Sequence, residues 1–462
     1  MSAPHLPKVA GIDSSVPAPA HTVQPSPAPT RVIPGPGAAL QDRLAGWVSD
    51  LTTLQELTER LARTTTLGEA LDELLRAGAA LAGARRGMVV LEPADGLGPD
   101  STVGLGLARH DLGTIETIPC GTTPYGRLVE TPPGLPGGSG ELARPDLLAE
   151  KGLDPRHREV AARLGIGASY ALALATTAAG PLGAAVWLYD EPAEPPERRR
   201  HLLGRYVRYA TEHLARLLEL ERSRAELATV TQELLPARLP RVAGVELAVR
   251  HRSGPRGGGD WYDALPLPEG ALGLSVGSVT GSGPSAVAAM GRLRASLRAY
   301  AVMEGEDPVA VLSDLELLLR LTEPARSATA LFAYCEPALR RLTLAGAGHC
   351  PPLIVGERRT EFVETSVSAP LGMLACWEAP SVELQPAAGE TVLFCTDGLL
   401  QRTGDATDRA YAKLHAAAAG VPSALRDDPD AIADHVLHTV LPDGLDRADS
   451  PEDVVLLAAR FR

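Results

Sequence analysis

The 462-residue sequence is short of lysine, of aromatic residues and of positive charge. Three lysines stand against 41 arginines (44 basic residues minus three), a bias that we interpret as GC-rich bacterial coding. Aromatic residues make up only 4% of the chain, so we expect cores built from Leu, Val and Ala. The formal net charge of −13 disfavours a nucleic-acid-binding protein, because contact with a phosphate backbone requires a basic surface.

Long apolar runs and closely paired cysteines are also absent. No run approaches the roughly 20 apolar residues that span a bilayer, and the N-terminus lacks the basic-then-apolar pattern of a secretory signal. We therefore expect a cytoplasmic protein with no membrane partner. The cysteines form no Cys-x-x-Cys pair, which disfavours a disulfide framework and a thiolate zinc site. We expect small core residues in reducing cytosol at Cys120, Cys335, Cys350, Cys376 and Cys395.

Composition and periodicity divide the chain into four regions. Its length suggests two or three domains. Residues 1–37 are rich in Pro and Ala without apolar periodicity, which predicts a disordered tail. Residues 38–200 predict an α/β domain with a leading helix, 201–235 a connecting helix, and 236–462 a second domain. The fold class that this order predicts is α+β multidomain.

Helices precede strands in the region 38–200. From residue 39 to residue 82, Leu and Ala recur at helical spacing, and Thr66 with Glu69 predicts a capping box at the start of a second helix. Strands are predicted at 87–91, at 115–118, and as a hairpin over 171–188.

This order of elements is accompanied by two characteristic phrases, Pro124-Tyr125-Gly126-Arg127-Leu128-Val129 and Gly180-Pro181-Leu182-Gly183-Ala184-Ala185-Val186-Trp187-Leu188. With them, the region resembles a GAF domain and implies a sensor. Its partner would be a small-molecule ligand, or the domain would be empty and serve only for dimerisation. No Cys or His spacing dictates haem, iron–sulfur or zinc.

The connecting region carries an apolar stripe with a break. Apolar residues occur at four- and three-residue spacing from Leu203 to Leu217, and then every seven residues at Leu220, Leu227 and Leu234. This pattern predicts one helix with a coiled-coil stripe whose register shifts between Leu217 and Leu220. Two alternatives stay open, namely a helix that makes a homodimer and a helix that packs on its own chain.

The region 236–462 alternates blocks of strands with pairs of helices. Strands are predicted at 245–251, 261–267 and 271–279, helices at 285–303 and 308–321, and further strands at 327–334, 341–344 and 391–395. Antiparallel strands in blocks with adjacent helices predict an α-β-β-α sandwich.

Short motifs follow one another along the same region. They are Leu234-Leu235-Pro236-Ala237-Arg238-Leu239-Pro240, Gly258-Gly259-Asp260-Trp261-Tyr262-Asp263, Gly277-Ser278-Val279-Thr280-Gly281-Ser282-Gly283, Ala347-Gly348-His349-Cys350-Pro351-Pro352-Leu353, Pro370-Leu371-Gly372, Thr396-Asp397-Gly398-Leu399 and Glu452-Asp453-Val454-Val455-Leu456-Leu457. As an ordered set, over about residues 230–462, they resemble the SpoIIE-type branch of the PPM (protein phosphatase 2C-like) family.

The resemblance implies an enzyme, a protein serine/threonine phosphatase. Its substrate would be a phosphoserine or phosphothreonine on a regulatory protein such as an anti-sigma-factor antagonist. The family attacks the phosphate with a water held between two Mg²⁺ or Mn²⁺ ions. Such hard cations prefer oxygen ligands, and the pair acidifies the water while neutralising the phosphoryl oxygens.

The family's functional residues transfer to this chain in part. Asp260 and Asp397 match acids of the catalytic metal site, and Glu452 and Asp453 match the two acids of the terminal Asp-Asp-Val, with the first lengthened to Glu. Ser278 stands where the family has the aspartate that bridges both metals, and a neutral hydroxyl cannot offset two neighbouring dications. The function is therefore either a sensor-regulated metal-dependent phosphatase or a catalytically degenerate PPM-fold signalling or scaffold module. A sensor with an inert second domain is a variant of the latter.

Some polar residues of the motifs have open roles. Asp263 either braces a turn or contacts a metal, and His349 is left outside the catalytic set. Ser282 and Gly346 replace a His and an Asn of the family pattern. Whether another acid, such as Glu269 or Asp405, replaces the missing carboxylate cannot be determined from the sequence.

Overall fold

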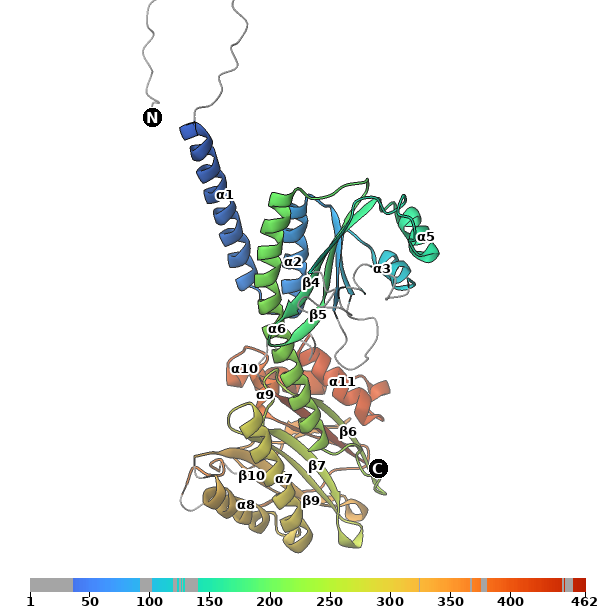
Figure 1. Ribbon diagram of the computed structural model, residues 1–462. Helices are drawn as coiled ribbons and strands as arrows, with labels where there is room; N and C mark the ends of the chain where they lie inside the picture. Colours follow the sequence, from blue (N-terminus) through green and yellow to red (C-terminus); the bar gives the residue numbers. More distant parts are fainter. Residues whose placement is uncertain are drawn as a thin grey trace, which may run out of the picture. The chain divides into compact units, whose positions relative to one another are not determined.

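The computed structural model describes residues 36–91, 102–118, 123, 126, 128, 140–323, 325–365, 368–374, 380–442, 444 and 452–462. The predicted disordered tail lies outside these residues except for its last two, which begin the first helix. Much of the phrase 124–129 and two cysteines, Cys120 and Cys376, also lie outside them. The chain forms two compact units, Met1–Leu214 and Ala215–Arg462. Each is described by itself below (Figure 1).

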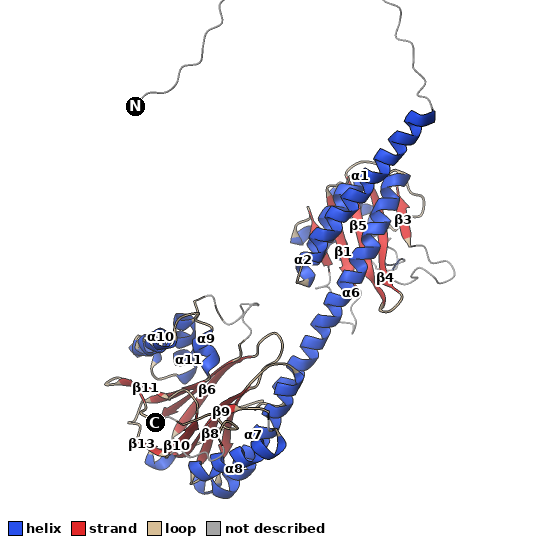
Figure 2. Cartoon of the chain, turned by 90° about the vertical axis from the view of Figure 1, so that its left-hand side faces the viewer, coloured by secondary structure: helices blue, strands red, loops and turns tan. Residues whose placement is uncertain are grey.

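The first unit combines helices with one antiparallel sheet of strand order β2-β1-β5-β4-β3. Helices α2 and α6 lie on one side of the sheet, and α3 and α5 lie on the other side (Figures 1 and 2). The strands are β1 (Arg86–Leu91), β2 (Thr102–Leu105), β3 (Glu141–Arg144), β4 (Ala168–Thr176) and β5 (Gly180–Tyr189). The helices are α1 (Pro36–Ala62), α2 (Leu67–Ala82), α3 (Arg109–Glu116), α5 (Pro155–Leu164) and the first part of α6 (Glu197–Glu233).

Two local predictions for this unit are confirmed, and one predicted strand is wrong. Thr66 Oγ1 accepts from the Glu69 N–H at 3.3 Å while the Glu69 carboxylate accepts from the Thr66 N–H, which is the predicted capping box. The hairpin β4–β5 is also present. The strand predicted at 115–118 is wrong, because Ile115 lies in α3. That helix begins where the Asp111 carboxylate accepts from the Ala108 N–H, and Ile115 is buried at helical spacing.

The connecting helix α6 buries its first stripe within the first unit. The side chains of Leu203, Val207, Ala210 and Leu214 are at most 3% exposed. This half of the helix therefore packs on its own unit, which is the second of the two alternatives. Farther along, Leu220 is 43% exposed. The homodimer through this helix stays a prediction.

The second unit consists of two five-stranded sheets between two layers of helices, as the predicted α-β-β-α sandwich requires. One sheet has the order β13-β10-β9-β8-β7 and packs against α7 and α8; the other has the order β12-β11-β14-β15-β6 and packs against α9, α10 and α11. The strands of the first sheet are β7 (Asp260–Pro266), β8 (Leu272–Val279), β9 (Ala328–Glu336), β10 (Arg341–Ala347) and β13 (Val382–Leu384). Those of the second are β6 (Val245–Arg252), β11 (Leu353–Val355), β12 (Thr360–Phe362), β14 (Thr391–Cys395) and β15 (Val454–Phe461). The helices are α7 (Pro284–Glu304), α8 (Pro308–Thr322), α9 (Asp397–Gln401), α10 (Thr407–Ala419) and α11 (Pro429–Val440).

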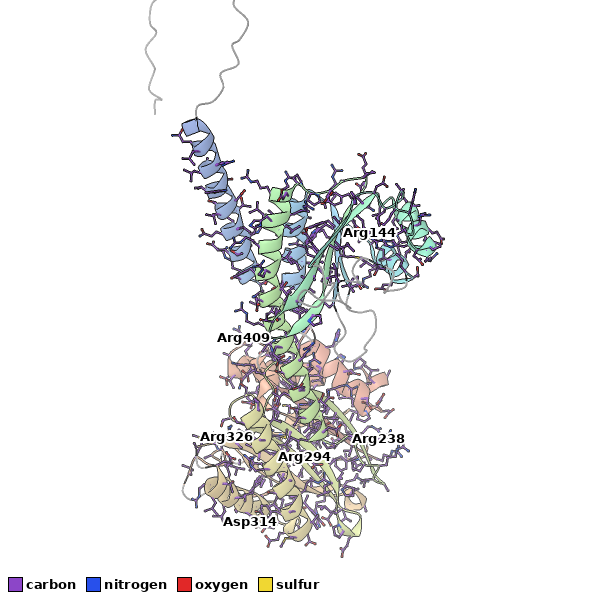
Figure 3. All side chains as sticks on the ribbon, in the orientation of Figure 1. Arg144, Arg238, Arg294, Asp314, Arg326 and Arg409 are labelled. Atoms are coloured by element: carbon purple, nitrogen blue, oxygen red, sulfur yellow. The ribbon has the colours of Figure 1, made fainter. Side chains whose placement is uncertain are left out.

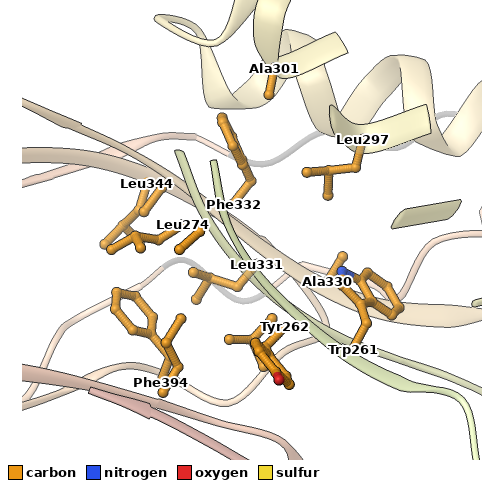
Figure 4. Packing of buried hydrophobic residues seen from close by; sticks show 14 of the residues in the cluster. Trp261, Tyr262, Leu274, Leu297, Ala301, Ala330, Leu331, Phe332, Leu344 and Phe394 are labelled. Carbon is orange, nitrogen blue, oxygen red and sulfur yellow. The ribbon is translucent and has the colours of Figure 1, made fainter. Parts of the chain in front are cut away.

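Alternation along the strands fills the space on both faces of the first sheet. Figure 4 shows Phe332 of β9 directed toward Leu297 and Ala301 of α7, whereas the preceding Leu331 lies on the side of Phe394, which comes from the second sheet. This period of two is what successive residues of a strand impose. All these side chains are at most 2% exposed. In the described part of the chain, no helix is both long enough and apolar enough to cross a bilayer.

Candidate functional site

Four acidic residues from both sheets of the second unit line one cavity of about 320 Å³. Asp260 is the first residue of β7 in one sheet. In the other sheet, Asp397 follows the end of β14 and opens α9, and Glu452 and Asp453 immediately precede β15. The fold therefore brings all four sequence-predicted site residues together, because strand ends of the two facing sheets meet at one edge.

The backbone around Asp260 is built to hold the carboxylate of Asp453. Asp453 Oδ1 accepts from the Gly254 N–H at 2.6 Å, and Oδ2 accepts from the Asp260 N–H at 3.2 Å. A Cβ atom on Gly258 would lie 1.5 Å from Asp453 Oδ2. The glycines before Asp260 thus permit a close approach of main chain to carboxylate that no other residue allows.

Asp260 is a buried acid with an unsatisfied oxygen. It is 4% exposed, its Oδ2 has no hydrogen-bond partner, and the hydroxyls of Ser278 and Thr396 lie close enough to lower its pKa in part. Burial raises the pKa of Asp260 most strongly, and the neighbouring Asp453 carboxylate raises it further. Burial also raises the pKa of Asp453, against the two backbone N–H groups that lower it. A positive charge in this cavity would stabilise both ionised acids.

Asp397 and Glu452 are positioned by the segment that follows β14. Asp397 Oδ2 accepts from Gln401 Nε2 at 2.8 Å, one turn along α9. The Glu452 carbonyl accepts from Arg402 Nε at 2.9 Å, which ties the start of β15 to the end of α9. Both carboxylates are left lining the cavity.

Ser278 lies at the centre of this arrangement. It stands directly opposite Asp260 in the β7–β8 ladder and directly opposite Thr329 in the β8–β9 ladder. Residues paired across neighbouring strands share a face of the sheet, and all three line the cavity. The position where the family resemblance expects a bridging aspartate therefore presents a hydroxyl to the site.

Three cavity or contact residues were not predicted from the sequence. Thr329 lines the cavity through its pairing with Ser278, a position that follows from strand register alone. Arg256 lines it from the loop before Asp260, and Thr396, whose Oγ1 accepts from the Val455 N–H at 3.0 Å, immediately precedes Asp397. A loop arginine and a lone threonine give no periodic or motif signal that would single them out.

The open alternative for Asp263 is decided by its contacts. Its carboxylate is buried and forms ion pairs with Arg294 at 3.0 Å and Arg298 at 3.4 Å, both on α7 (Figure 3 labels Arg294). It does not line the acidic cavity. Asp263 therefore braces the first sheet against α7.

Other acids considered as replacements lie elsewhere. Glu269 sits in the tight turn between β7 and β8 with a φ of 59°, beside a different cavity. Asp405 pairs with Arg409 at 3.7 Å. His349 is half-buried, and its Nδ1 donates to the Cys350 carbonyl at 3.0 Å. None of these three lines the acidic cavity.

The donor set fits one hydrated divalent cation. Mg²⁺ typically keeps several waters and binds through one or two carboxylates. The unpartnered oxygen of Asp260 together with Asp397 supplies such a set. Within the residues that the structure describes, no group of three or more His, Cys, Asp and Glu side chains is placed to hold a metal ion. The bridging carboxylate of a two-ion centre is missing at Ser278.

Comparison with protein families identifies the domain that contains the acidic cavity. Residues 268–462 match the family described as Stage II sporulation protein E (SpoIIE). The second unit thus contains a PPM-family serine/threonine phosphatase domain. Ser278, Asp397, Glu452 and Asp453 fall inside the match, and Asp260 precedes it. The match does not reach the first unit, for which the GAF resemblance stays a prediction.

Several solved structures are similar to the chain. The RsbU and RsbW domains of a Mycobacterium tuberculosis protein share 29% identity over 50% of this chain and 63% of theirs, with a TM-score of 0.45. The phosphatase domain and regulatory fragment of SpoIIE from Bacillus subtilis share 18% sequence identity with this chain. The match covers 47% of this chain and 63% of that one, with a TM-score of 0.40. RsbX in complex with magnesium shares 14% sequence identity. The match covers 49% of this chain and 99% of that one, with a TM-score of 0.37. The chain thus spans less than two thirds of the first two.

Proposed function

We propose that the protein is a signal-regulated, metal-dependent phosphatase that hydrolyses phosphoserine or phosphothreonine on a regulatory protein, such as an anti-sigma-factor antagonist. The observation that carries the proposal is the convergence of Asp260, Asp397, Glu452 and Asp453 on one cavity within a PPM phosphatase domain. The first unit would serve as the GAF-like sensor for a small molecule, and α6 would connect it to the phosphatase domain.

Asp260 and Asp397 would hold Mg²⁺ or Mn²⁺, with Glu452 and Asp453 adding negative charge around it. When bound, the ion acidifies a water and neutralises phosphoryl oxygens. The chain's own residues prepare the cavity for it. Backbone N–H groups orient Asp453, Arg402 fixes the backbone at Glu452, and the hydroxyls of Ser278 and Thr396 favour the ionised form of Asp260. The exposed Arg256 at the cavity would attract the phosphorylated side chain.

The test is phosphate release from phosphoserine proteins by the full chain with Mn²⁺. We expect Asp260→Asn and Asp397→Asn each to abolish release, since each removes a carboxylate from the cavity. Glu383→Gln is the matched control, because Glu383 is an exposed acid of β13 that does not line the cavity. Equal activity in all four proteins would overturn the assignment of the site. No release from the wild type, with release from Ser278→Asp, would overturn the phosphatase function of this chain.

The second candidate is a degenerate module that works by contact with a phosphoprotein. It is favoured by one specific observation, the hydroxyl of Ser278 directly opposite Asp260. A calorimetric Mn²⁺ titration separates the candidates. Saturable binding that Asp397→Asn removes supports the enzyme, whereas no measurable binding in the wild type and clear binding in Ser278→Asp supports the degenerate module.

A further inference from the structure

One face of α1 is apolar and exposed. Apolar side chains recur at spacings of four and three residues along the helix, at Leu40, Leu44, Trp47, Leu51 and Leu54. This is the spacing of a coiled-coil seam, which a second helix normally covers. The first four of these residues are 48% to 67% exposed, and Val48 beside them is 63% exposed. The face therefore stays uncovered within the part of the chain that the structure describes.

The helix that carries this face is fixed at its other end. Leu61, one heptad after Leu54, is completely buried in the first unit. Arg198 of α6 donates from Nε to Asp50 Oδ2 at 2.9 Å and from Nη2 to the Gly46 carbonyl at 2.9 Å. In Figures 1 and 2 the N-terminal half of α1 extends past the other helices of the unit. The apolar face is thus held in a defined orientation and projects from the unit.

A groove beside this face leaves room for a second helix. It has a volume of about 860 Å³ and lies between α1 and α6. Trp47, Leu51 and Leu54 line it from α1, and the exposed Arg198 and Arg205 line it from α6. A contiguous apolar face next to an open groove is typical of a protein–protein contact.

The charges that flank the seam indicate a second copy of α1 in antiparallel orientation. An antiparallel pair with Leu44 of one copy against Trp47 of the other aligns the two seams. It places each Arg43 opposite Asp50 of the second copy, and the two-fold symmetry repeats this ion pair. A parallel pair in register would place Arg43 opposite Val48, where no ion pair can form. The charges on this flank of α1 are therefore self-complementary only in the antiparallel pair.

The size of the face is sufficient for a dimer. Two copies of the five exposed apolar side chains would bury on the order of 1,000 Å² in total, which is the lower limit for a specific interface. Asp50 keeps its bond to Arg198 in such a pair, because a carboxylate offers about four acceptor sites. Prolines interrupt residues 1–35, which disfavours a covering helix from the same chain.

We propose that α1 is a homodimerisation element. Two copies of the protein associate through an antiparallel pair of α1 helices over residues 40–51, with Arg43 of each copy bound to Asp50 of the other. The buried end of each helix lies outside this stretch, so the two first units lie toward opposite ends of the pair. The interface is separate from the exposed stripe of α6 at Leu220, and it does not depend on the phosphatase function.

Sedimentation equilibrium of the full chain tests the association. We expect the wild type to sediment as a dimer and Leu44→Glu as a monomer, because a charge replaces the centre of the apolar seam. Leu220→Glu is the matched control and should stay dimeric, since Leu220 is a similarly exposed leucine of α6 outside this face. An unchanged thermal unfolding midpoint shows that Leu44→Glu is folded. A monomeric wild type would overturn the proposal, as would a dimer that Leu220→Glu dissociates and Leu44→Glu does not.

The ion pair is tested by charge reversal and by salt. We expect Arg43→Glu to weaken the dimer by about tenfold at low salt, because each new glutamate faces Asp50 of the other copy. High salt should reduce this difference, since it screens exposed charges. Arg63→Glu is the control with the same charge change, because Arg63 is exposed and lies beyond the shared stretch. Wild-type affinity of Arg43→Glu at low salt would contradict the antiparallel alignment.

Cysteine cross-linking measures the direction of the two helices. Leu40→Cys and Leu51→Cys, oxidised as a mixture, should form a disulfide with each other, because residue 40 of one copy faces residue 51 of the other. Each variant oxidised alone should stay unlinked, whereas a parallel pair would link each variant to itself. The wild type oxidised in the same way measures any link between native cysteines. Self-links above the wild-type level, or no link in the mixture, would refute the antiparallel dimer.

Discussion

Asp260 and Ser278 stand directly opposite each other on two neighbouring strands, and the hydroxyl of Ser278 favours the ionised form of the Asp260 carboxyl, which lowers its pKa against the larger effect of burial. A third carboxylate, at position 278, would face the buried Asp260–Asp453 pair, and only a cation could hold all three charges. In this chain a neutral hydroxyl occupies that place. The residue opposite Asp260 therefore determines how strongly the cavity binds a cation.

Restoring the acid at this position should strengthen metal binding. We expect Ser278→Asp to raise Mn²⁺ affinity by at least about tenfold, since even groups that only support metal ligands change affinity about 10–100-fold. Without metal the same variant should unfold at lower temperature, because it adds an unpaired charge beside a buried acid. Calorimetric titration and thermal unfolding with and without Mn²⁺ measure both effects. Ser278→Asn keeps the polarity without the charge and should show neither.

The close contact at Gly258 predicts a strong effect of one methyl group. Gly258→Ala would place a Cβ on the Asp453 carboxylate, so the loop or the acid must move. We expect loss of Mn²⁺ binding and a lower unfolding midpoint. Gly346→Ala is the control, because a Cβ there meets its nearest neighbour at 4.0 Å. If the two variants bind and unfold alike, the packing around Asp453 is not what the structure shows.

The ion pairs of Asp263 predict a stability effect without a metal effect. Asp263→Ala leaves the nearly buried Arg294 without its carboxylate partner, which we expect to cost about 3 kcal/mol of unfolding free energy. Mn²⁺ affinity should stay within about twofold of the wild type when measured under conditions where the variant is folded, given that shifts below about 0.4 kcal/mol are within ordinary coupling of distant sites. Denaturant unfolding measures the change in stability, and calorimetric titration measures the Mn²⁺ affinity. A large loss of Mn²⁺ affinity would show that Asp263 contributes to metal binding after all.

The first unit should lose stability in mild acid through His157. Burial lowers the pKa of this histidine to about 4 from its usual 6.5. Below pH 6.5 His157 is protonated in the unfolded chain but stays neutral in the folded unit. The free energy of unfolding therefore falls as the pH falls from 6.5 toward 4, by at most ~3 kcal/mol. Denaturant unfolding across this range, with His157→Gln as the variant that lacks the titration, measures the effect. A parallel loss in both proteins would assign the effect to other groups.

Much of the fold could be predicted from local signals. The capping box at Thr66, the hairpin β4–β5 and the strands on either side of the Pro268–Gly270 turn depend on residues a few positions apart, which the sequence displays directly. The strand predicted at 115–118 failed because a short β-branched run has no period of its own, and the cap at Asp111 favoured a helix. The ordered motifs identified the phosphatase domain because each one is a local phrase.

The site itself required the tertiary structure. The sequence named Asp260, Asp397, Glu452 and Asp453, but the hydrogen bond between Asp260 and Asp453 joins positions 193 residues apart. Such a distance is set by how two sheets stack, and no local pattern encodes it. The same holds for Arg294 and Arg298, the partners of Asp263. The amino-acid sequence by itself determined which side chains carry the chemistry; strand register and sheet packing decided which of them meet, because burial and close contact are properties of the folded chain.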